Sequence, residues 1–508
     1  MSISVHTVRL IRLAVRRASS MIVREPHGAM AIIAPVLSCI LASSAAAETL
    51  VPLGDEFVLN LRTEGIQHAP DVVASSPTAY TVSWTSDKFA EPARIFVTDL
   101  SCSQPPPEEV LVATSATAGS SVGSVLAATK RGVFLAWEEN RLQPDDTRDY
   151  SVVTQGLFDT HTLAGGSYRP LGARSGNEFQ PVVVATDSRE AAVAWVDYDR
   201  EPGDIGYASR IRWQRVGLSG LRRGGIRDVA PYSSSALPIN PAIAMAGDGK
   251  LALAWQALDE DDTGDNIRLQ RFLLDGTALG AATLVNVATA GPQQRPKLLT
   301  GPHDRLLVVW ETPDSDDFGV VGRIFDGGGL PLGPEFLINQ VEANRQDYPR
   351  VSDLLSGRFL VSWESRSPDE SGYDLFARVY AWDGQALGDE FQINTFAHGD
   401  QRDQVSAMDA RGNVLFVWAS EQDGDKRGIV GRHFALSAPI CGDAYVGSGC
   451  RAIGATDALV ALRAALSDGA CAACICDTDN SGTIQASDAL SILREAVDLV
   501  GELSCPTC

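Results

Sequence analysis

Seven short runs of apolar residues along the chain end in tryptophan, at Trp84, Trp137, Trp195, Trp255, Trp310, Trp363 and Trp418. Neighbouring tryptophans are 53 to 60 residues apart. Runs such as residues 306–310 and 414–418 are rich in Val, Leu and Phe and too short for a typical helix, so each predicts a buried strand. In five units a proline precedes the run that ends in tryptophan. We expect a separate first strand to start after this proline. The second unit lacks the proline. These prolines are Pro70, Pro181, Pro241, Pro296 and Pro349.

Each unit continues in the same order after its tryptophan. An acidic loop is followed by a third apolar stretch such as residues 320–325, a turn such as Asp326-Gly327, and a fourth stretch such as residues 335–339. Four antiparallel strands in about 55 residues, repeated seven times, predict a mainly β protein with a seven-bladed β-propeller over residues 48–438. Since one sheet cannot bury both of its faces alone, we expect the tryptophans to pack between adjacent blades.

The ends of this repeat suggest how the ring closes. Residues 53–60 have the pattern of the fourth strands at 332–339 and 387–394, whereas the seventh unit stops after its third strand at 432–435. The first strand of the repeat is therefore expected to complete the last blade, which would leave no open sheet edge there. The units resemble the tryptophan-bearing propeller repeats of secreted bacterial proteins. That resemblance implies the fold and says little about function.

The N-terminal segment has the three parts of a secretion signal. Five arginines precede an apolar stretch at 29–41, and small residues end it at 45–47. We therefore predict a signal peptide over residues 1–47 and a secreted or cell-surface protein, extracellular or periplasmic. An alternative is a lipoprotein acylated at Cys39. No later apolar run approaches the ~20 residues of a membrane span.

Charge and motifs restrict the function. The formal net charge of −22 argues against a nucleic-acid partner, which needs a basic face. The acidic loops after the tryptophans, such as residues 259–262 and 314–317, are expected to share one face with the links between blades. They would form a solvated surface, a weak calcium site or a docking face for a cationic partner. The sialidase Asp-box, a histidine cluster and a Gly-x-Ser-x-Gly motif are all absent, so the sequence assigns no catalytic residue.

Residues 439–508 differ from the repeat and predict a small Cys-rich α-helical domain. Seven cysteines occur between Cys441 and Cys508, and a helical pattern at 488–497 repeats the one at 457–466, 31 residues earlier. After a signal peptide, disulfides are the expected state of these cysteines. Zinc binding and redox chemistry are the alternatives for the two Cys-x-x-Cys pairs.

The loop before the second helical pattern has the ligand spacing of a calcium site. Oxygen-bearing side chains stand at positions 1, 3, 5 and 12 of the loop, with Gly482 at the turn. The alternative is an Asx-rich turn that caps the helix without metal. The expected Ca²⁺ ligands are Asp477, Asp479, Ser481, Asp488 and the backbone carbonyl of Thr483.

Two such loop–helix units 31 residues apart resemble a dockerin. The resemblance implies a cohesin-like or other cell-surface protein as partner. The first unit departs from the pattern because its loop lacks three acidic ligands, which leaves calcium binding there open. The partner contacts that the family implies map to Ala486, Ser487 and Arg494, and by the repeat to Ala455, Thr456 and Arg463.

The sequence thus favours a secreted, non-catalytic binding or scaffolding protein. In this hypothesis the propeller presents a face for an unknown ligand such as a glycan, and the calcium-loaded tail docks it to a partner. The alternative is a polysaccharide-active hydrolase tethered by its tail. A third hypothesis is a structural spacer in a cell-surface layer.

Overall fold

The computed structural model describes most of residues 50–436 and a few parts of the chain that follows. Within 50–436 it leaves out 89–90, 102–108, 115–120, 143–147, 160–161, 164–176, 188, 200–207, 230–236, 259–263, 356, 368–371 and 424–425. Beyond 436 it describes 461–462, 465, 476, 478 and 484–496. Residues 1–47, where the signal peptide and Cys39 were predicted, lie outside the described residues. Among those it does describe, no helix is long and apolar enough to cross a membrane.

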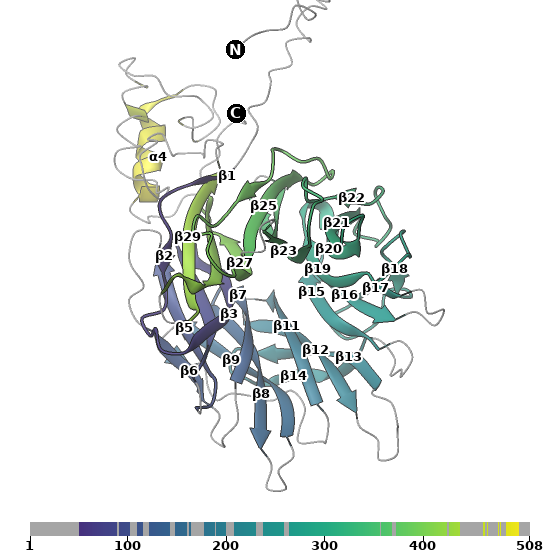
Figure 1. Ribbon diagram of the computed structural model, residues 1–508. Helices are drawn as coiled ribbons and strands as arrows, with labels where there is room; N and C mark the ends of the chain where they lie inside the picture. The colour runs from purple at the N-terminus through teal and green to yellow at the C-terminus, as the bar shows by residue number, and fades with distance from the viewer. Residues whose placement is uncertain are drawn as a thin grey trace, which may run out of the picture. The chain divides into compact units, whose positions relative to one another are not determined.

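Seven antiparallel sheets surround a common axis, and we number these blades 1 to 7 in chain order (Figure 1). Blade 1 holds β3 (Ile66–Ser76), β4 (Ala79–Asp87), β5 (Arg94–Ser101) and β6 (Val110–Thr114). Blade 2 holds β7 (Ser121–Thr129), β8 (Gly132–Leu142), β9 (Arg148–Asp159) and β10 (Thr162–Leu163). Blade 3 holds β11 (Asn177–Asp187), β12 (Glu190–Asp199), β13 (Ala208–Gly217) and β14 (Arg222–Asp228).

The remaining blades follow the same order. Blade 4 holds β15 (Ile239–Met245), β16 (Leu251–Leu258), β17 (Asp265–Phe272) and β18 (Thr283–Leu284). Blade 5 holds β19 (Gln294–Thr300), β20 (Leu306–Pro313), β21 (Phe318–Phe325) and β22 (Phe336–Leu337), with the short helix η2 (Pro302–Asp304). Blade 6 holds β23 (Gln346–Leu354), β24 (Arg358–Arg366), β25 (Tyr373–Ala381) and β26 (Phe391–Gln392). Blade 7 holds β27 (Arg402–Met408), β28 (Asn413–Ser420), η3 (Glu421–Asp423) and β29 (Gly428–Leu436), together with β1 (Leu50–Pro52) and β2 (Phe57–Val58).

The first strand of each blade is the innermost one, and these seven strands form a closed ring. Each contacts the innermost strand of the next blade, and β27 of the last blade contacts β3 of the first. The second strands lie between neighbours on both sides; every residue of β28 is buried, as is nearly all of β16. Burial on both faces explains why these strands are continuous apolar runs in the sequence. The prediction of a seven-bladed propeller is confirmed.

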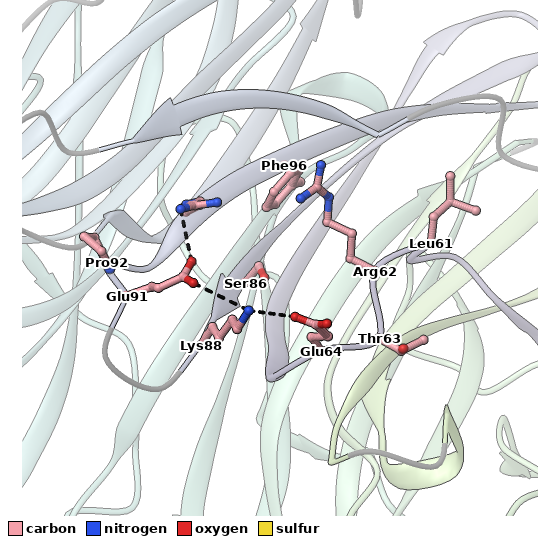
Figure 2. Close-up of a pocket in the computed structure, with 10 residues that line it drawn as sticks. Leu61, Arg62, Thr63, Glu64, Ser86, Lys88, Glu91, Pro92 and Phe96 are labelled. Atoms are coloured by element: carbon pink, nitrogen blue, oxygen red, sulfur yellow. Dashed lines mark hydrogen bonds and ion pairs between the residues drawn. The ribbon is translucent and has the colours of Figure 1, made fainter.

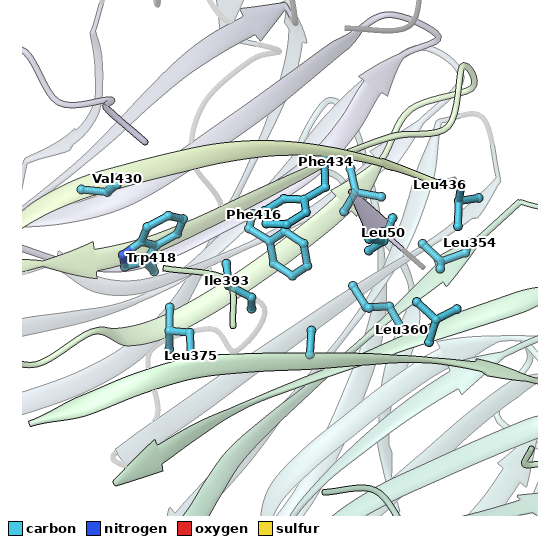
Figure 3. Close-up of a cluster of buried hydrophobic side chains, with 13 residues drawn as sticks. Leu50, Leu354, Leu360, Leu375, Ile393, Phe416, Trp418, Val430, Phe434 and Leu436 are labelled. Carbon is cyan, nitrogen blue, oxygen red and sulfur yellow. The ribbon is translucent and has the colours of Figure 1, made fainter. Parts of the chain in front are cut away.

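The core consists of seven apolar clusters, one at each interface between adjacent blades. Each of the seven tryptophans packs between adjacent blades, as predicted, and in every case the neighbour is the preceding blade. Between blades 6 and 7, for example, Trp418 and Phe416 pack against Leu375 and Ile393 (Figure 3). Because each cluster takes side chains from two blades, a blade keeps its core only while its neighbours are in place.

The N-terminal strand closes the ring, as the sequence predicts. β2 pairs with β29, with Phe57 opposite Gly431, and β1 extends the pairing from Leu50 to Pro52. Asn60 then accepts a hydrogen bond on Oδ1 from the Ile429 N–H at 2.6 Å and donates to the Arg62 carbonyl at 2.8 Å. The same pair of bonds is made in blades 4, 5 and 6 by Asn286, Asn339 and Asn394.

Glutamates that stand one residue before the fourth strands tie neighbouring blades together at the outer rim. The Glu390 carboxylate of blade 6 accepts a hydrogen bond at 2.6 Å from the Gln340 N–H, which follows the asparagine of blade 5. Glu56 does the same for Thr395 across the junction of blades 6 and 7. Glu109 of blade 1 then accepts from Leu61, so this tie also bridges the point where the ring closes.

We predict that Asn60→Ala destabilises the propeller by about 1–3 kcal/mol, because it leaves the buried Ile429 N–H without an acceptor. Denaturant unfolding followed by tryptophan fluorescence measures this cost. Asn339→Ala is the matched control, since it removes the same bond inside a blade made of consecutive strands. Equal losses in the two variants support ring closure by the N-terminal strand. A loss in Asn339→Ala alone would contradict it.

Candidate functional site

Each innermost strand contains a β-bulge, where its register against the second strand shifts. The bulge places one residue per blade in the left-handed region, with φ between 48° and 64°. Six of these seven residues are not glycine, and a non-glycine residue in this region costs of order 1 kcal/mol or more. The seven bulge residues are Ala69, Gly123, Gln180, Asn240, Arg295, Tyr348 and Asp403.

The bulge corrects one prediction from the sequence. In five blades a proline follows the bulge residue directly, so the prolines lie inside the first strands and do not precede them; Pro70, for example, is the fifth residue of β3. A proline has no N–H to give to a ladder and is tolerated in a strand at a bulge. The irregular pairing therefore lets the strand begin several residues earlier than the proline suggests.

The backbone N–H of each bulge residue donates to a side chain of the preceding blade. In five blades the acceptor is the residue that follows the recurring tryptophan of the unit. Examples are Glu311, which accepts from Tyr348 at 2.8 Å, and Glu364, which accepts from Asp403 at 2.8 Å. The other three acceptors of this kind are Thr85 for Gly123, Glu138 for Gln180 and Gln256 for Arg295.

Two blades have an apolar residue after the tryptophan, and there a substitute acceptor is found. Val196 in blade 3 and Ala419 in blade 7 have no side-chain acceptor. In blade 3 the bulge residue Gln180 accepts the Asn240 N–H on its own side chain at 2.8 Å. In blade 7 the bulge residue Asp403 accepts the Ala69 N–H at 3.4 Å. All seven bulges are thus tied to the blade before them.

A cavity of about 490 Å³ lies at the axis and is lined by the bulge regions of all seven blades. Five charged residues line it: Asp71, Arg295, Lys297, Arg350 and Asp403. Three of them stand two residues after a bulge, where blades 2, 3, 4 and 7 carry valine or alanine. Charged side chains in this otherwise apolar row identify the cavity as the candidate site.

Asp71 of blade 1 is held by backbone groups at this cavity. Its carboxylate accepts hydrogen bonds from its neighbour Val72 at 2.9 Å and from Leu126 of blade 2 at 2.6 Å. Burial raises the pKa of Asp71 to about 6, although the two N–H groups and the charges of Arg350 and Lys297 oppose the shift. A carboxyl with this pKa can hold a proton near neutral pH and donate it.

Lys297 of blade 5 has no counterion of its own. Within the residues that the structure describes, its ammonium forms no hydrogen bond and no ion pair. Burial, followed by the charge of Arg350, lowers the pKa of Lys297 to about 7. Arg350 is held by one hydrogen bond, donated to the Pro349 carbonyl at 3.2 Å. The cavity therefore holds two neighbouring cations of which neither is paired with a carboxylate.

Two arginines around the axis are paired with glutamates. Arg295 forms an ion pair with Glu311 at 2.7 Å, and its guanidinium lies 4.3 Å from the centre of the Tyr348 ring. Arg402 pairs with Glu364 at 2.8 Å. Burial raises the pKa of Glu364 to about 8, and Arg402 opposes the shift. These pairs hold two of the acceptors of the bulge N–H groups, Glu311 and Glu364, in place. They leave Asp71, Lys297, Arg350 and Asp403 for a ligand.

The acidic loop of blade 5 lies on the face predicted for it. In the loop between β20 and β21, Asp316 accepts the Asn344 N–H at 2.7 Å and Asp317 pairs with Arg345 at 3.1 Å. Asn344 and Arg345 belong to the link between blades 5 and 6, so the loop and the link share one face. The loop at 259–262 lies outside the described residues.

A second pocket, of about 660 Å³, lies between the link at 61–64 and blade 1 (Figure 2). Lys88 pairs there with Glu64 at 2.7 Å and with Glu91 at 3.5 Å, and Arg94 also pairs with Glu91 at 3.1 Å. Arg62 lies 5.2 Å from the centre of the Phe96 ring. The cations of this pocket already have carboxylate or aromatic partners, so the pocket is a weaker candidate than the axial cavity.

Little of the predicted C-terminal module is described. Of the calcium ligands only Asp488 is, in α4 (Ala486–Ala496), and it is buried. Its carboxylate accepts from the Thr478 N–H at 2.8 Å and from the Gln485 N–H at 2.7 Å, an arrangement that caps the helix. Ala486, Ser487 and Arg494 are exposed on α4. Asp477, Asp479, Ser481, Thr483, Ala455, Thr456 and Arg463 lie outside the described residues.

The described residues of this tail also have a small core of their own. Ala461, Cys476, Ala489 and Ile492 are buried together. Cys476 is disulfide-bonded. The other six cysteines of the tail lie outside the described residues, so their pairing stays a prediction.

No protein-family model and no curated protein matches the chain. Solved structures that resemble it include a protein of unknown function from Dyadobacter fermentans DSM 18053, at 13% identity over 77% of this chain and 99% of that one, with a TM-score of 0.49. A second is the α-L-arabinanase of Penicillium chrysogenum, at 11% identity over 75% and 98% of the two chains, with a TM-score of 0.43. A third is Trypanosoma rangeli sialidase, at 10% identity over 78% and 59%, with a TM-score of 0.39. Similarity at this level says nothing about the ligand or reaction of this chain.

Sequence reasoning did not find the axial residues. They nevertheless leave a signal in the sequence, because Asp71, Lys297 and Arg350 each follow a proline of the repeat, in Ala-Pro-Asp, Arg-Pro-Lys and Tyr-Pro-Arg. Aligning the units on that proline shows three charged residues in a column that is otherwise apolar. What the alignment does not show is that the column lines a cavity at the axis.

Proposed function

We propose that the protein is a polysaccharide-active hydrolase whose active site is the axial cavity. The observation that carries this proposal is Asp71, a carboxyl group with a pKa of about 6 at a cavity of about 490 Å³. Glycoside hydrolysis needs one carboxylic acid that protonates the leaving oxygen and one carboxylate on the other side of the bond. Asp71 has the properties of the first group.

Asp403 of the adjoining blade is the second carboxylate in this proposal. Its Oδ2 atom accepts the N–H of Ala69, which stands two residues before Asp71, at 3.4 Å. Asp403 and Asp71 line the same cavity. The Oδ1 atom of Asp403 accepts no hydrogen bond within the described residues. Asp403 would act as base or nucleophile while Asp71 donates its proton to the leaving group. This arrangement favours the hydrolase over the non-catalytic scaffold that the sequence suggested first.

We predict that Asp71→Asn lowers kcat/KM on the best glycan substrate by about 10²–10⁴-fold, the usual contribution of a general acid. Asp403→Asn should cause a loss of similar size. In the unsubstituted protein the rate should fall as the pH rises through about 6, because Asp71 then loses the proton that it donates. The measurement is the release of reducing ends from a panel of polysaccharides.

Asp55→Asn is the control for this experiment, since Asp55 is exposed on the chain that leads into β2. It should leave the rate unchanged, and circular dichroism should show that all variants are folded. Turnover that survives in both Asp71→Asn and Asp403→Asn would place the active site elsewhere. Absence of turnover on every glycan would contradict the proposal.

The C-terminal module supplies the tether in this proposal and binds one Ca²⁺ through Asp477, Asp479, Ser481, Thr483 and Asp488. The support is the loop spacing, with oxygens at positions that surround a single cation. A cohesin-like or cell-surface partner would then contact Ala486, Ser487 and Arg494, with Thr456 and Arg463 from the first unit. Ca²⁺ would order the loop next to these residues.

We predict that calorimetric titration of the full chain with CaCl₂ shows one site of micromolar or tighter affinity. Asp477→Ala should abolish this site, because position 1 of the loop supplies a carboxylate ligand. The matched control is Asp457→Ala, which changes the last position of the first loop, where three acidic ligands are missing. Equal binding in all three proteins would show that the calcium lies elsewhere.

A further inference from the structure

Two cations in the axial cavity have no carboxylate partner, and they stand at equivalent positions of consecutive blades. Lys297 of blade 5 and Arg350 of blade 6 each follow the bulge residue by two positions. They are close enough that the charge of Arg350 lowers the pKa of Lys297. Two like charges at the wall of a partly dehydrated cavity repel each other and cost folding free energy unless an anion joins them.

The one carboxylate in the same row as these two cations does not neutralise both. Asp71 is the acidic residue in the same row of the cavity, and its oxygens are engaged by the N–H groups of Val72 and Leu126. The remaining members of the row, at the same position after the bulge in blades 2, 3, 4 and 7, are Val125, Val182, Ala242 and Val405. This row therefore carries two positive charges and at most one negative charge.

This local excess of positive charge contrasts with the rest of the protein. The chain has a formal net charge of −22, and one of its only five lysines is in this cavity. The nearby arginines that line or flank the axis, Arg295 and Arg402, are paired with Glu311 and Glu364. Lys297 and Arg350 differ from them in having no such partner among the described residues. An anion that enters the cavity would therefore find them available.

We infer that Lys297 and Arg350 bind an oxyanion on the substrate, so that the cavity accepts an acidic glycan and discriminates against a neutral one. This inference rests on the proposed function for the identity of the ligand as a sugar. The oxyanion is a sugar carboxylate or a sulfate ester, which share the charge and the acceptor oxygens that an ammonium and a guanidinium recognise. Tyr348 also lines the cavity, and in this inference its hydroxyl binds a sugar hydroxyl.

The test measures binding, so that it stands apart from the hydrolysis assay. The full chain is titrated at pH 6 with D-galacturonate, with D-galactose 6-sulfate and with D-galactose, which is the neutral counterpart of both. We expect at least tenfold tighter binding of one or both anions than of galactose. Tighter binding of galacturonate than of the sulfate identifies a carboxylate as the preferred group, and the reverse order identifies a sulfate.

Variants then assign the preference to the two cations. Lys297→Met, of similar length and without charge, and Arg350→Met should each weaken binding of the preferred anion by about ten- to a hundredfold, as expected for the loss of a charged hydrogen bond. Lys297→Arg should restore most of the affinity, because it keeps the charge. Lys88→Met, in the pocket beside blade 1, is the control and should bind like the unsubstituted protein. Circular dichroism checks that each variant keeps the fold of the unsubstituted protein.

The two proposals can fail separately. Anion-selective binding without turnover of any glycan supports this inference and contradicts the hydrolase. Turnover of neutral and acidic glycans alike, with equal affinity for galactose and galacturonate, supports the hydrolase and overturns the inference. An anion preference that survives in both methionine variants also overturns it, and so does absence of binding of all three sugars.

Discussion

The hydrogen bond from each bulge N–H to the preceding blade is the interaction on which the rest of this structure depends. It occurs at all seven junctions, with donor–acceptor distances from 2.7 to 3.4 Å. A bulge leaves one residue out of the ladder of its own sheet, and here that residue is also in the unfavourable left-handed region. A bond to the neighbouring blade satisfies its N–H and fixes the distance between blades near the axis. The apolar clusters hold the blades together farther out.

The chemistry of the axial cavity follows from this constraint. In blades 5 and 6 the acceptors are the buried carboxylates Glu311 and Glu364, and a buried carboxylate is stable only with a partner. Arg295 and Arg402 supply it, which brings arginines to the edge of the cavity. In the other blades the acceptors are the uncharged side chains of Thr85, Gln180 and Gln256 and the carboxylates of Glu138 and Asp403. The charged wall of the cavity thus lies mainly at blades 5 to 7, with Asp71 of blade 1 next to them across the closure of the ring.

Much of the fold could be predicted from the sequence, because the residues that form each blade recur at a regular spacing along the chain. The tryptophans recur since each fills the interface with the preceding blade, and the match of residues 53–60 to other fourth strands predicts ring closure. The bulges could not be predicted in the same way. In a sequence, a proline suggests a strand boundary, and only the pairing of β3 with β4 on both sides of Pro70 shows that Pro70 lies inside β3.

The candidate site could not be predicted from the sequence either, because its residues come together only in the folded ring. Asp71, Lys297 and Arg350 are hundreds of residues apart or in separate units, and each alone looks like an ordinary surface charge among more than a hundred charged residues. Their common feature is a place two residues after the bulge, which has meaning only in the closed ring. The predicted calcium loop, by contrast, depends on local spacing, and its ligands other than Asp488 lie outside the described residues.

The most direct test of this account is native-state hydrogen exchange of the bulge amides. These N–H groups face a cavity of about 490 Å³, so they would exchange rapidly if they were free. We predict that the amides of Gln180, Tyr348 and Asp403, which have acceptors within 2.8 Å, exchange only through larger openings and are as protected as the amides of the second strands. Exchange at the rate of exposed loops would contradict the claim that these bonds hold the ring and shape its axial site.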